Sequence, residues 1–372
     1  MRTIRTDDVR ARLGALATAG LDLDGYAHGF LELLGRAVPH EIGCLATTDP
    51  ATGLVTRTFK VNLPDHLDRE VARFEYEVDD VNLFQEIARR PDPVGVLHLD
   101  TDGRPEVSAR WRELLVPHFG QAHELRAVFR LRGDTWGLLA IFRPAGVSGF
   151  NPAEADFVAR LSPTVVSGLR AGLVASVEPQ TSDTTGPAVL VVGADGRLSQ
   201  ITPAGEQRLG ELGGDPARGL PLPLLSLVAA ARAYADGRRA IPPRLRVRTP
   251  SGQFLVGDAA PLADRTRTGR DVIVTLEEAR PPDIAPLVVA AFGLTPRERD
   301  IVGHALRGAD TREIGRRLHL SPYTVQEHLT SIFDKAGVRN RRELTSRVFL
   351  DQYAPRLGSS LAPSGWFDDR AG

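Results

Sequence analysis

The chain has 372 residues, 42% of them hydrophobic and 25% charged, so two or three globular domains with sizeable cores are expected. A formal net charge of -1 excludes a uniformly basic nucleic-acid wrapper, although a single basic domain would be hidden in that sum. Cys44 is the only cysteine, which excludes an internal disulfide, a CxxC redox pair and a cysteine-based zinc site. The charged N-terminus lacks a signal peptide and the apolar stretches are too short to span a bilayer, so a cytoplasmic protein without a membrane partner is expected.

Two breaks in the apolar periodicity divide the chain. Ser, Thr, Pro and Asp dominate the first break, and adjacent prolines mark the second, from Glu277 to Asp283. The organisation expected from these breaks is a first domain over 1–175, a linker over 176–186, a second domain over 187–280, a third over 288–353, and a flexible tail over 354–372.

The first domain opens with helical periodicity and continues with strands. IGCLATTD and LVTRTFKVNL flank a turn-rich DPATG segment, and ELRAVFRLR and TWGLLAIFRP flank a short Gly-Asp turn, so two hairpins are predicted. A single helix is predicted from an N-cap at Asn151 to the region of Leu173. Helices at both ends of an antiparallel sheet indicate an α+β domain, with Cys44 on a strand as a small core side chain rather than a redox sensor.

The order of the WGLLAIFRP strand, the GFNPAEADFVARL segment and the long helix resembles the end of a GAF domain, and the resemblance covers roughly Asp22 to Leu173. It implies a sensor module for an unknown small molecule or another regulatory signal, often as a dimer. No other cofactor is expected.

The next domain begins with a strand, an Ala-Asp-Gly turn, a second strand and a helix that opens at Thr202-Pro203. PRLRVRT, GQFLVGDAAPLAD and DVIVTLEEA are three further strand candidates. RLRVRT is interpreted as a strand edge or a solvated face in preference to an anion-binding site. This order resembles a PAS domain from Gly186 to Glu278.

Four helix starts in the last domain can be predicted from their caps. They are Thr295, Asp310, Ser321 and Asn340, and Gly308 and Gly337 occupy the positions of C-terminal stops. Only His319-Leu320-Ser321 separates the second helix from the third, which is typical of a helix-turn-helix, with the motif at 311–330. An all-α four-helix domain is therefore expected.

The third of these helices has an apolar and a polar side. Its core stripe is Val325, Leu329, Ile332, Phe333 and Ala336, and its outward stripe is Tyr323, Gln326, Glu327, Thr330 and Asp334. Residues 292–350 contain eleven Arg and Lys against seven Asp and Glu, a local charge of +4. A basic helix-turn-helix on an otherwise acidic chain is expected where phosphates are bound.

LTPRERDIV and the segment GADTREIGRRLHLSPYTVQEHLTSIFDKAGVRNRREL are similar, from Leu294 to Leu344, to the LuxR-type (GerE, NarL-like) DNA-binding domain. The resemblance implies that Gln326, Glu327 and Thr330 read bases and that Thr311, Thr324 and Lys335 lie near phosphates. It also implies a dimer contact on the last helix, 341–350. Arg312, Tyr323, Arg339 and Arg341 complete the predicted DNA-binding set, with no catalytic or metal residue.

This sequence has Gln326 where many members of that family have lysine, with Glu327 beside it. Glutamine can bond adenine N6 and N7 together, and glutamate can accept a hydrogen bond from cytosine N4. Phosphate attraction must then come more from arginines such as Arg312, Arg316, Arg339 and Arg341.

The function predicted from the sequence is a nucleoid-associated transcriptional regulator that is not an enzyme. Its partners would be double-stranded promoter DNA, a second copy of the chain in a homodimer, and RNA polymerase. The alternatives are a sigma-factor-like protein, an acyl-homoserine-lactone-type regulator, or a signalling enzyme with a DNA-binding tail.

Overall fold

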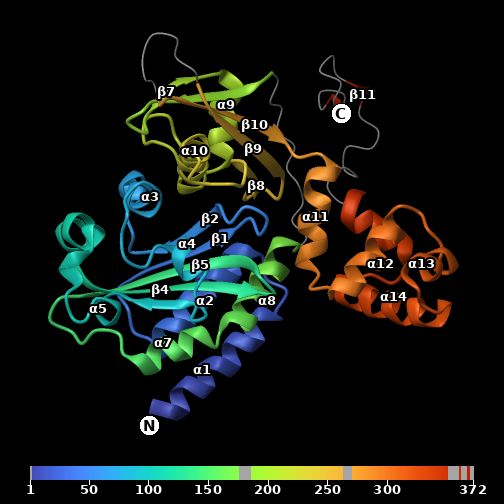
Figure 1. Cartoon of the computed structure of the whole chain (residues 1–372), viewed down its shortest axis with the longest axis horizontal. Coiled ribbons are helices and arrows are strands. Elements are labelled where there is room, and N and C mark those ends of the chain that lie inside the picture. The colour runs from blue at the N-terminus through green and yellow to red at the C-terminus, as the bar shows by residue number, and fades with distance from the viewer. Residues whose placement is uncertain (1, 176–185, 263–269, 351–359, 362–366, 369–372) are drawn as a thin grey trace. The chain divides into compact units, whose positions relative to one another are not determined.

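The computed structural model describes residues 2–175, 186–262, 270–350, 360–361 and 367–368 (Figure 1). The chain divides into two compact units, and the boundary after the second sheet falls between Glu278 and Ala279. The predicted linker lies outside the described residues except for its last residue, and so does most of the predicted tail, apart from the short pair β11 (Ser360–Leu361) and β12 (Phe367–Asp368). In the described part of the chain, no helix has the length and apolar character needed to cross a membrane.

The first unit contains a five-stranded antiparallel sheet of order β2-β1-β5-β4-β3. Its strands are β1 (Ile42–Thr48), β2 (Val55–Val61), β3 (Val94–Val96), β4 (Gln121–Leu131) and β5 (Asp134–Pro144). Both predicted hairpins are confirmed, β1 with β2 and β4 with β5. The second turn is built on Arg132 and Gly133 rather than on the predicted Gly-Asp pair, and both residues have positive φ, as a type I′ two-residue turn requires.

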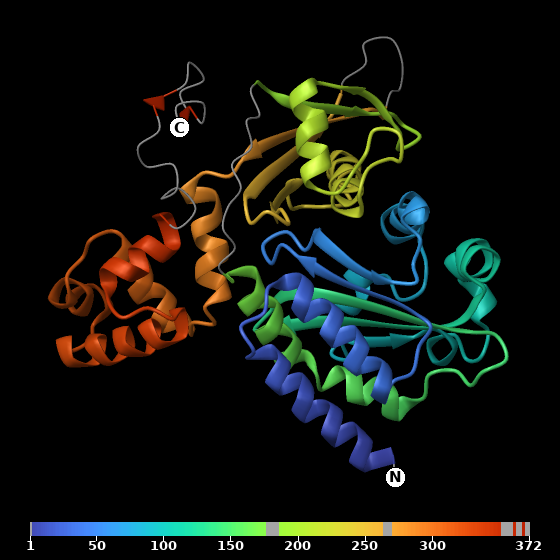
Figure 2. The ribbon, with the colours of Figure 1, turned by 180° about the vertical axis from the view of Figure 1, so that it is seen from behind.

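Long helices cover one face of this sheet. α1 (Arg2–Ala17), α2 (Leu23–Ala37) and α8 (Ser162–Leu173) pack on one another, and α2 and α8 pack on the sheet (Figure 2). The remaining elements are α3 (Asp68–Tyr76), α4 (Phe84–Ile87), α5 (Leu97–Asp100), α6 (Val116–Phe119), α7 (Pro152–Ala159), two 3-10 turns (Asp65–Leu67, Pro105–Val107) and a π turn (Trp111–Leu115).

The prediction of one unbroken helix after Asn151 is wrong in its continuity. Asn151 does cap α7, with the reciprocal bond from its backbone N–H to Glu154. The helix stops at Ala159, however, and α8 begins at Ser162 with Pro163 in its first turn. Proline lacks the N–H that would continue the earlier helix, so the chain restarts there.

A second five-stranded antiparallel sheet in the same unit has the order β7-β6-β10-β9-β8. The strands are β6 (Ala188–Val192), β7 (Leu198–Ile201), β8 (Arg244–Arg248), β9 (Phe254–Pro261) and β10 (Val272–Glu278), and α9 (Pro203–Glu211) starts at the predicted Thr202 cap. The sequence interpretation did not assign α10 (Leu222–Ala235), which is apolar around most of its circumference and buried along most of its length. A helix buried on all sides lacks the amphipathic period that would identify it.

α10 packs on the second sheet and on α3 and β2 of the first, so one hydrophobic cluster joins the two sheets. Polar links supplement this cluster. Arg246 of β8 donates from Nη2 to Asp49 Oδ1 at 2.6 Å and from Nε to Asp49 Oδ2 at 2.8 Å, and Asp49 is 1% exposed. Arg248 donates to the carbonyls of Leu173 and Ala175. RLRVR is therefore an edge strand, as predicted. Two of its arginines bind residues that precede the second sheet in the chain, namely Asp49, Leu173 and Ala175.

Cys44 lies on β1 in this first unit, and its side chain is half-buried. Burial raises the pKa of its thiol to about 12, an effect that Lys60 and Arg126 only partly offset. Because the thiolate is the reactive form, the folded protein should react with iodoacetamide far more slowly than the urea-unfolded protein at pH 7. Mass spectrometry of the labelled chain measures this difference. Equal rates in the two states would show that the thiol is accessible and ionised.

The second unit is helical in its described part up to Leu350. Its elements are α11 (Pro281–Ala291), α12 (Pro296–Leu306), α13 (Thr311–Leu318), α14 (Pro322–Ala336), α15 (Arg341–Thr345) and a π turn (Ser346–Leu350). All four predicted N-caps are confirmed. The prolines at Pro281 and Pro282 begin α11 rather than only ending the preceding strand, because proline fits the first turn of a helix.

Candidate nucleic-acid interface

Side chains in the first turn of α12 bond to α13 and α14, the neighbouring helices labelled in Figure 1. Thr295 caps the helix by accepting from Glu298 N–H, and the Glu298 carboxylate accepts from Thr295 N–H at 2.7 Å. Arg297 donates to the Leu318 carbonyl at the end of α13. These residues therefore position the neighbouring helices and need not touch a ligand.

Glu298 also ties α12 to α14. Its carboxylate is buried and accepts from Lys335 Nζ at 2.6 and 2.7 Å and from Ser331 Oγ at 2.8 Å. Burial alone would raise the pKa of Glu298, but the hydrogen bonds from Lys335, from the Thr295 backbone and from Ser331 outweigh it and lower the pKa to about 2. The carboxylate is therefore ionised at neutral pH and fixes the angle between the two helices.

Glu298→Gln should loosen this joint. A carboxyl group with a lowered pKa stabilises the fold above its unfolded pKa, near 4.5, and this contribution is lost as the pH falls towards about 2. We expect the variant to lose about 1–3 kcal/mol at pH 7, since bonds to a charged group are removed, and to show a flatter pH dependence in that window. Hydrogen exchange of the α12 and α14 amides in the full chain measures both.

Glu313→Gln is the matched control, because Glu313 also stands at the third position of a helix but pairs with Arg317 on the surface. It should cost less than about 1 kcal/mol. An equal loss in both variants would contradict the role assigned to the buried carboxylate.

The joint between α13 and α14 depends on two backbone features. His319 ends α13 in the left-handed conformation, with φ of 55°. At Gly315 a Cβ atom would lie 2.7 Å from the Leu320 carbonyl oxygen, closer than real Cβ contacts. The turn therefore lets α14 cross α13 at a distance that only glycine permits.

The core and outer sides of α14 are as predicted. Val325, Leu329, Ile332 and Ala336 are buried, and Phe333 is half-buried. The outward stripe is exposed throughout, with Tyr323 at 74%. Among the described residues of that stripe, Thr330 Oγ1 donates to the Gln326 carbonyl, whereas the Gln326 and Glu327 side chains reach solvent. A polar helix face free to meet another molecule is the arrangement that base recognition requires.

The other predicted residues fall into two groups. Arg312 at the start of α13 and Arg339 after α14 are exposed, and Thr311 is half-buried. Thr324 Oγ1 lies 2.9 Å from Ser321 Oγ within the cap of α14. Lys335, predicted to lie near phosphate, is paired with Glu298, and Arg341 donates to the Ala309 carbonyl. Any contribution of Lys335 and Arg341 to phosphate binding stays a prediction, because both also hold the domain together.

The structural roles of Arg297, Glu298 and Lys335 were missed by the sequence interpretation. The Thr295 cap could be predicted from the sequence, but nothing local indicates that the Glu298 carboxylate binds a lysine 37 residues later. Among the described residues, no group of three or more His, Cys, Asp and Glu side chains could hold a metal ion. The outward stripe of α14 has exposed hydrogen-bonding groups, and exposed arginines lie near it in the chain. This arrangement suits the binding of a polar molecule.

Residues 293–348 match the family described as "Bacterial regulatory proteins, luxR family". This part of the chain is therefore a LuxR-family helix-turn-helix domain, consistent with the resemblance noted in the sequence. The matched residues lie in the second unit, so the GAF-like and PAS-like interpretation of the first unit stays a prediction.

Curated relatives match the same end of the chain. The monoamine regulon transcriptional regulator of Klebsiella aerogenes is 39% identical over 94 residues, which cover 22% of this chain and 41% of the relative. The transcriptional regulatory protein UhpA of Salmonella typhimurium is 40% identical over 70 residues, 18% of this chain and 36% of the relative. The chain thus covers less than half the length of these relatives.

Solved structures with some likeness include Escherichia coli SdiA, at 11% identity and a TM-score of 0.31, over 92% of this chain and 95% of that one. Another is a VqmA dimer of Vibrio cholerae without its target DNA, described as a LuxR-type receptor, at 13% identity and a TM-score of 0.23, over 47% of this chain and 90% of that one.

Proposed function

We propose that the chain is a sequence-specific transcriptional regulator that binds promoter DNA through α14 and responds to a signal received by its first unit. The observation that carries this proposal is the exposed polar stripe of α14 on a LuxR-family helix-turn-helix domain with a local charge of +4. Exposed arginines beside the stripe supply attraction to phosphates, and the stripe supplies groups that discriminate base edges.

Gln326 and Glu327 are the residues that we propose to read bases, together with Thr330 and Tyr323. All four side chains are exposed on the outer side of α14. Arg312, Arg316 and Arg339 are the proposed phosphate contacts, because they too are exposed and flank the helix-turn-helix. Thr311, Thr324, Lys335 and Arg341 remain in the proposed interface at its edge.

The first unit is proposed to be the sensor, with a GAF-like part over the first sheet and a PAS-like part over the second. Support comes from the two antiparallel sheets, each flanked by helices. If the strands of each sheet are numbered from one in chain order, both sheets have the order 2-1-5-4-3. Such α+β modules fit a sensor better than the helical promoter-melting domain that a sigma factor would need.

A homodimer is the proposed binding form, and RNA polymerase is a further proposed partner. Two helix-turn-helix domains bound to half-sites about one helical turn apart would contact successive major grooves on one face of the DNA. A signal in the first unit would act by changing how often the dimer adopts the spacing that fits both half-sites.

Sequencing of sheared genomic DNA retained by the purified full chain tests this proposal. The expected result is enrichment of a small set of regions upstream of genes, with binding that weakens as the salt concentration rises. Retention of no DNA, or of all sequences equally, would contradict it.

A further inference from the structure

A row of small side chains leaves a hollow in the middle of the first sheet. On neighbouring strands, Lys60 of β2 faces Cys44 of β1, Cys44 faces Ala140 of β5, and Ala140 faces Arg126 of β4. Two small side chains therefore lie between two long cationic ones on the same face of the sheet.

Other side chains close this hollow into a cavity of about 70 Å³. Its apolar side is formed by Leu114, Leu115, Phe119 and Phe142, and its polar side by Lys60, Glu75, Arg110, Glu124 and Arg126. Leu222 of α10 and Tyr76 of α3 also line the cavity. The cavity is thus bounded in part by the helix that joins the two sheets.

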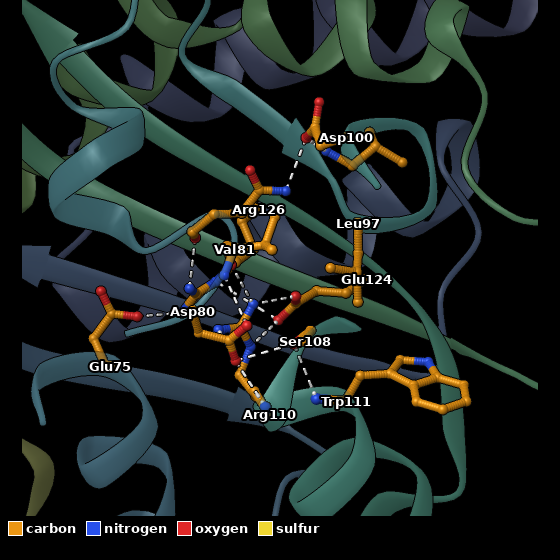
Figure 3. A network of polar contacts seen from close by, with 12 residues as sticks. Glu75, Asp80, Val81, Leu97, Asp100, Ser108, Arg110, Trp111, Glu124 and Arg126 are labelled. Carbon is orange, nitrogen blue, oxygen red and sulfur yellow. Dashed lines mark hydrogen bonds and ion pairs between the residues drawn. The ribbon is translucent and has the colours of Figure 1, made fainter. Parts of the chain in front are cut away.

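The cations that line the cavity are already paired with carboxylates, and Figure 3 shows the pairs of Arg110 and Arg126. Arg110 binds Glu124 through two hydrogen bonds, of 3.1 and 2.7 Å, and lies 3.5 Å from Asp80. Arg126 donates to Glu75 at 2.6 Å, and Lys60 donates to Asp68 at 2.6 Å. Together these groups hold three cations and four carboxylates, so the cavity does not favour an anion.

One N–H donor in this network, Nε of Arg126, makes no hydrogen bond within the described part of the chain. Arg126 is 4% exposed, and its Nη1 and Nη2 donate to the Asn82 carbonyl and to Glu75. Its Nε has no hydrogen-bond partner among the described residues and lies 3.6 Å from Glu124 Oε1. The Phe84 ring covers the guanidinium at 3.8 Å. A buried donor without a partner costs free energy that an acceptor on a ligand would recover.

We propose that this cavity binds a small uncharged molecule with an apolar body and one hydrogen-bond acceptor, which the Arg126 Nε–H group engages. The inference rests on the proposed function, because it gives the first unit a ligand to sense. The cavity volume of about 70 Å³ suits a small molecule. The apolar wall selects the body of the ligand, and the free donor selects its acceptor.

The position of the cavity also allows a bound ligand to affect the packing of the second sheet. Leu222 belongs both to the cavity wall and to the hydrophobic cluster that joins the sheets. A ligand that touches Leu222 and Tyr76 therefore changes the packing of α10, the element shared by both halves of the first unit.

Three probes test the proposal on the full chain. Cyclopentanone has an apolar ring and a carbonyl acceptor, methylenecyclopentane has the same shape without the acceptor, and isobutyrate is a small anion. Ligand-observed NMR titration should show cyclopentanone binding about tenfold more tightly than methylenecyclopentane, because one buried hydrogen bond distinguishes them. Isobutyrate should bind most weakly. Equal affinity for the first two probes, stronger binding of isobutyrate, or no binding of cyclopentanone would each overturn the proposal.

Variants of the cavity wall, with one control outside it, locate the binding. Ala140→Leu fills the hollow and should remove cyclopentanone binding, whereas Ala51→Leu, at an exposed position of the β1–β2 turn, should leave it unchanged. Arg126→Lys removes the Nε–H donor and should bring the affinities of cyclopentanone and methylenecyclopentane together. If Ala140→Leu does not fold, as judged by circular dichroism, Cys44→Val narrows the same hollow and should weaken cyclopentanone binding. Unchanged binding in the folded cavity variants would place the probe elsewhere.

Failure here is distinguishable from failure of the proposed function. Probe binding is measured without DNA, and genomic DNA retention is measured without a probe. A chain that retains specific DNA but binds no cyclopentanone would overturn only the ligand assignment.

Discussion

Gly315→Ala is expected to reduce specific DNA binding by at least tenfold while leaving the first unit folded. The added Cβ would lie 2.7 Å from the Leu320 carbonyl oxygen, which belongs to the backbone and cannot rotate away. The turn must therefore open, and α14 must shift against α13. Overpacking of this kind costs about 1–3 kcal/mol, more than the ~1 kcal/mol that alanine gains over glycine in a helix.

Gly303→Ala provides the matched control for Gly315. Gly303 lies in α12, and its added Cβ would meet Arg307 Nη1 at 3.7 Å, an ordinary contact. This control should keep full DNA affinity and gain slightly in stability. Fluorescence anisotropy on a selected DNA site compares the two variants, and equal affinities would show that the tight turn does not position α14 for binding.

Gln326→Ala is expected to relax base preference, whereas Arg312→Ala is expected to weaken binding to every sequence. Gln326 is exposed on the outer side of α14, and loss of a good bidentate base contact costs about 1–3 kcal/mol on the preferred site. Arg312 is exposed at the start of α13, and loss of one phosphate contact reduces the salt slope by about 1 on preferred and random DNA alike.

Salt titrations on a selected site and on random DNA separate these effects. Equal losses on both DNAs in both variants would contradict the division between base-reading and phosphate-binding residues. Arg341 is a poor choice for this test, because it donates to the Ala309 carbonyl and its loss would also disturb the fold.

The DNA-binding domain was predictable from sequence because its signals are local. Each helix start carries its own cap, as at Thr295 and Ser321, and the stripe of α14 follows from helical periodicity. The link between Glu298 and Lys335 was not predictable, since it depends on how two helices cross.

The first unit was predictable in its local features, such as the hairpins and the helix caps at Asn151 and Thr202. α10 has no polar side and its burial depends on two sheets, so its role could not be found from its own residues. The pairing of Asp49 with Arg246 likewise joins residues far apart in the chain. The cavity depends on the register between β1 and β5, which places Cys44 beside Ala140. This register could not be predicted from the sequence.

A hydroxyl-radical and methylation footprint of the full chain on its selected DNA site tests the central claim most directly. If α14 reads promoter DNA as part of a dimer, two protected major-groove segments should lie about one helical turn apart on one face. Gln326→Ala should remove protection of particular bases without moving the protected backbone. Protection confined to the minor groove, or none at all on DNA that the chain retains, would contradict the assignment of α14 as the recognition helix.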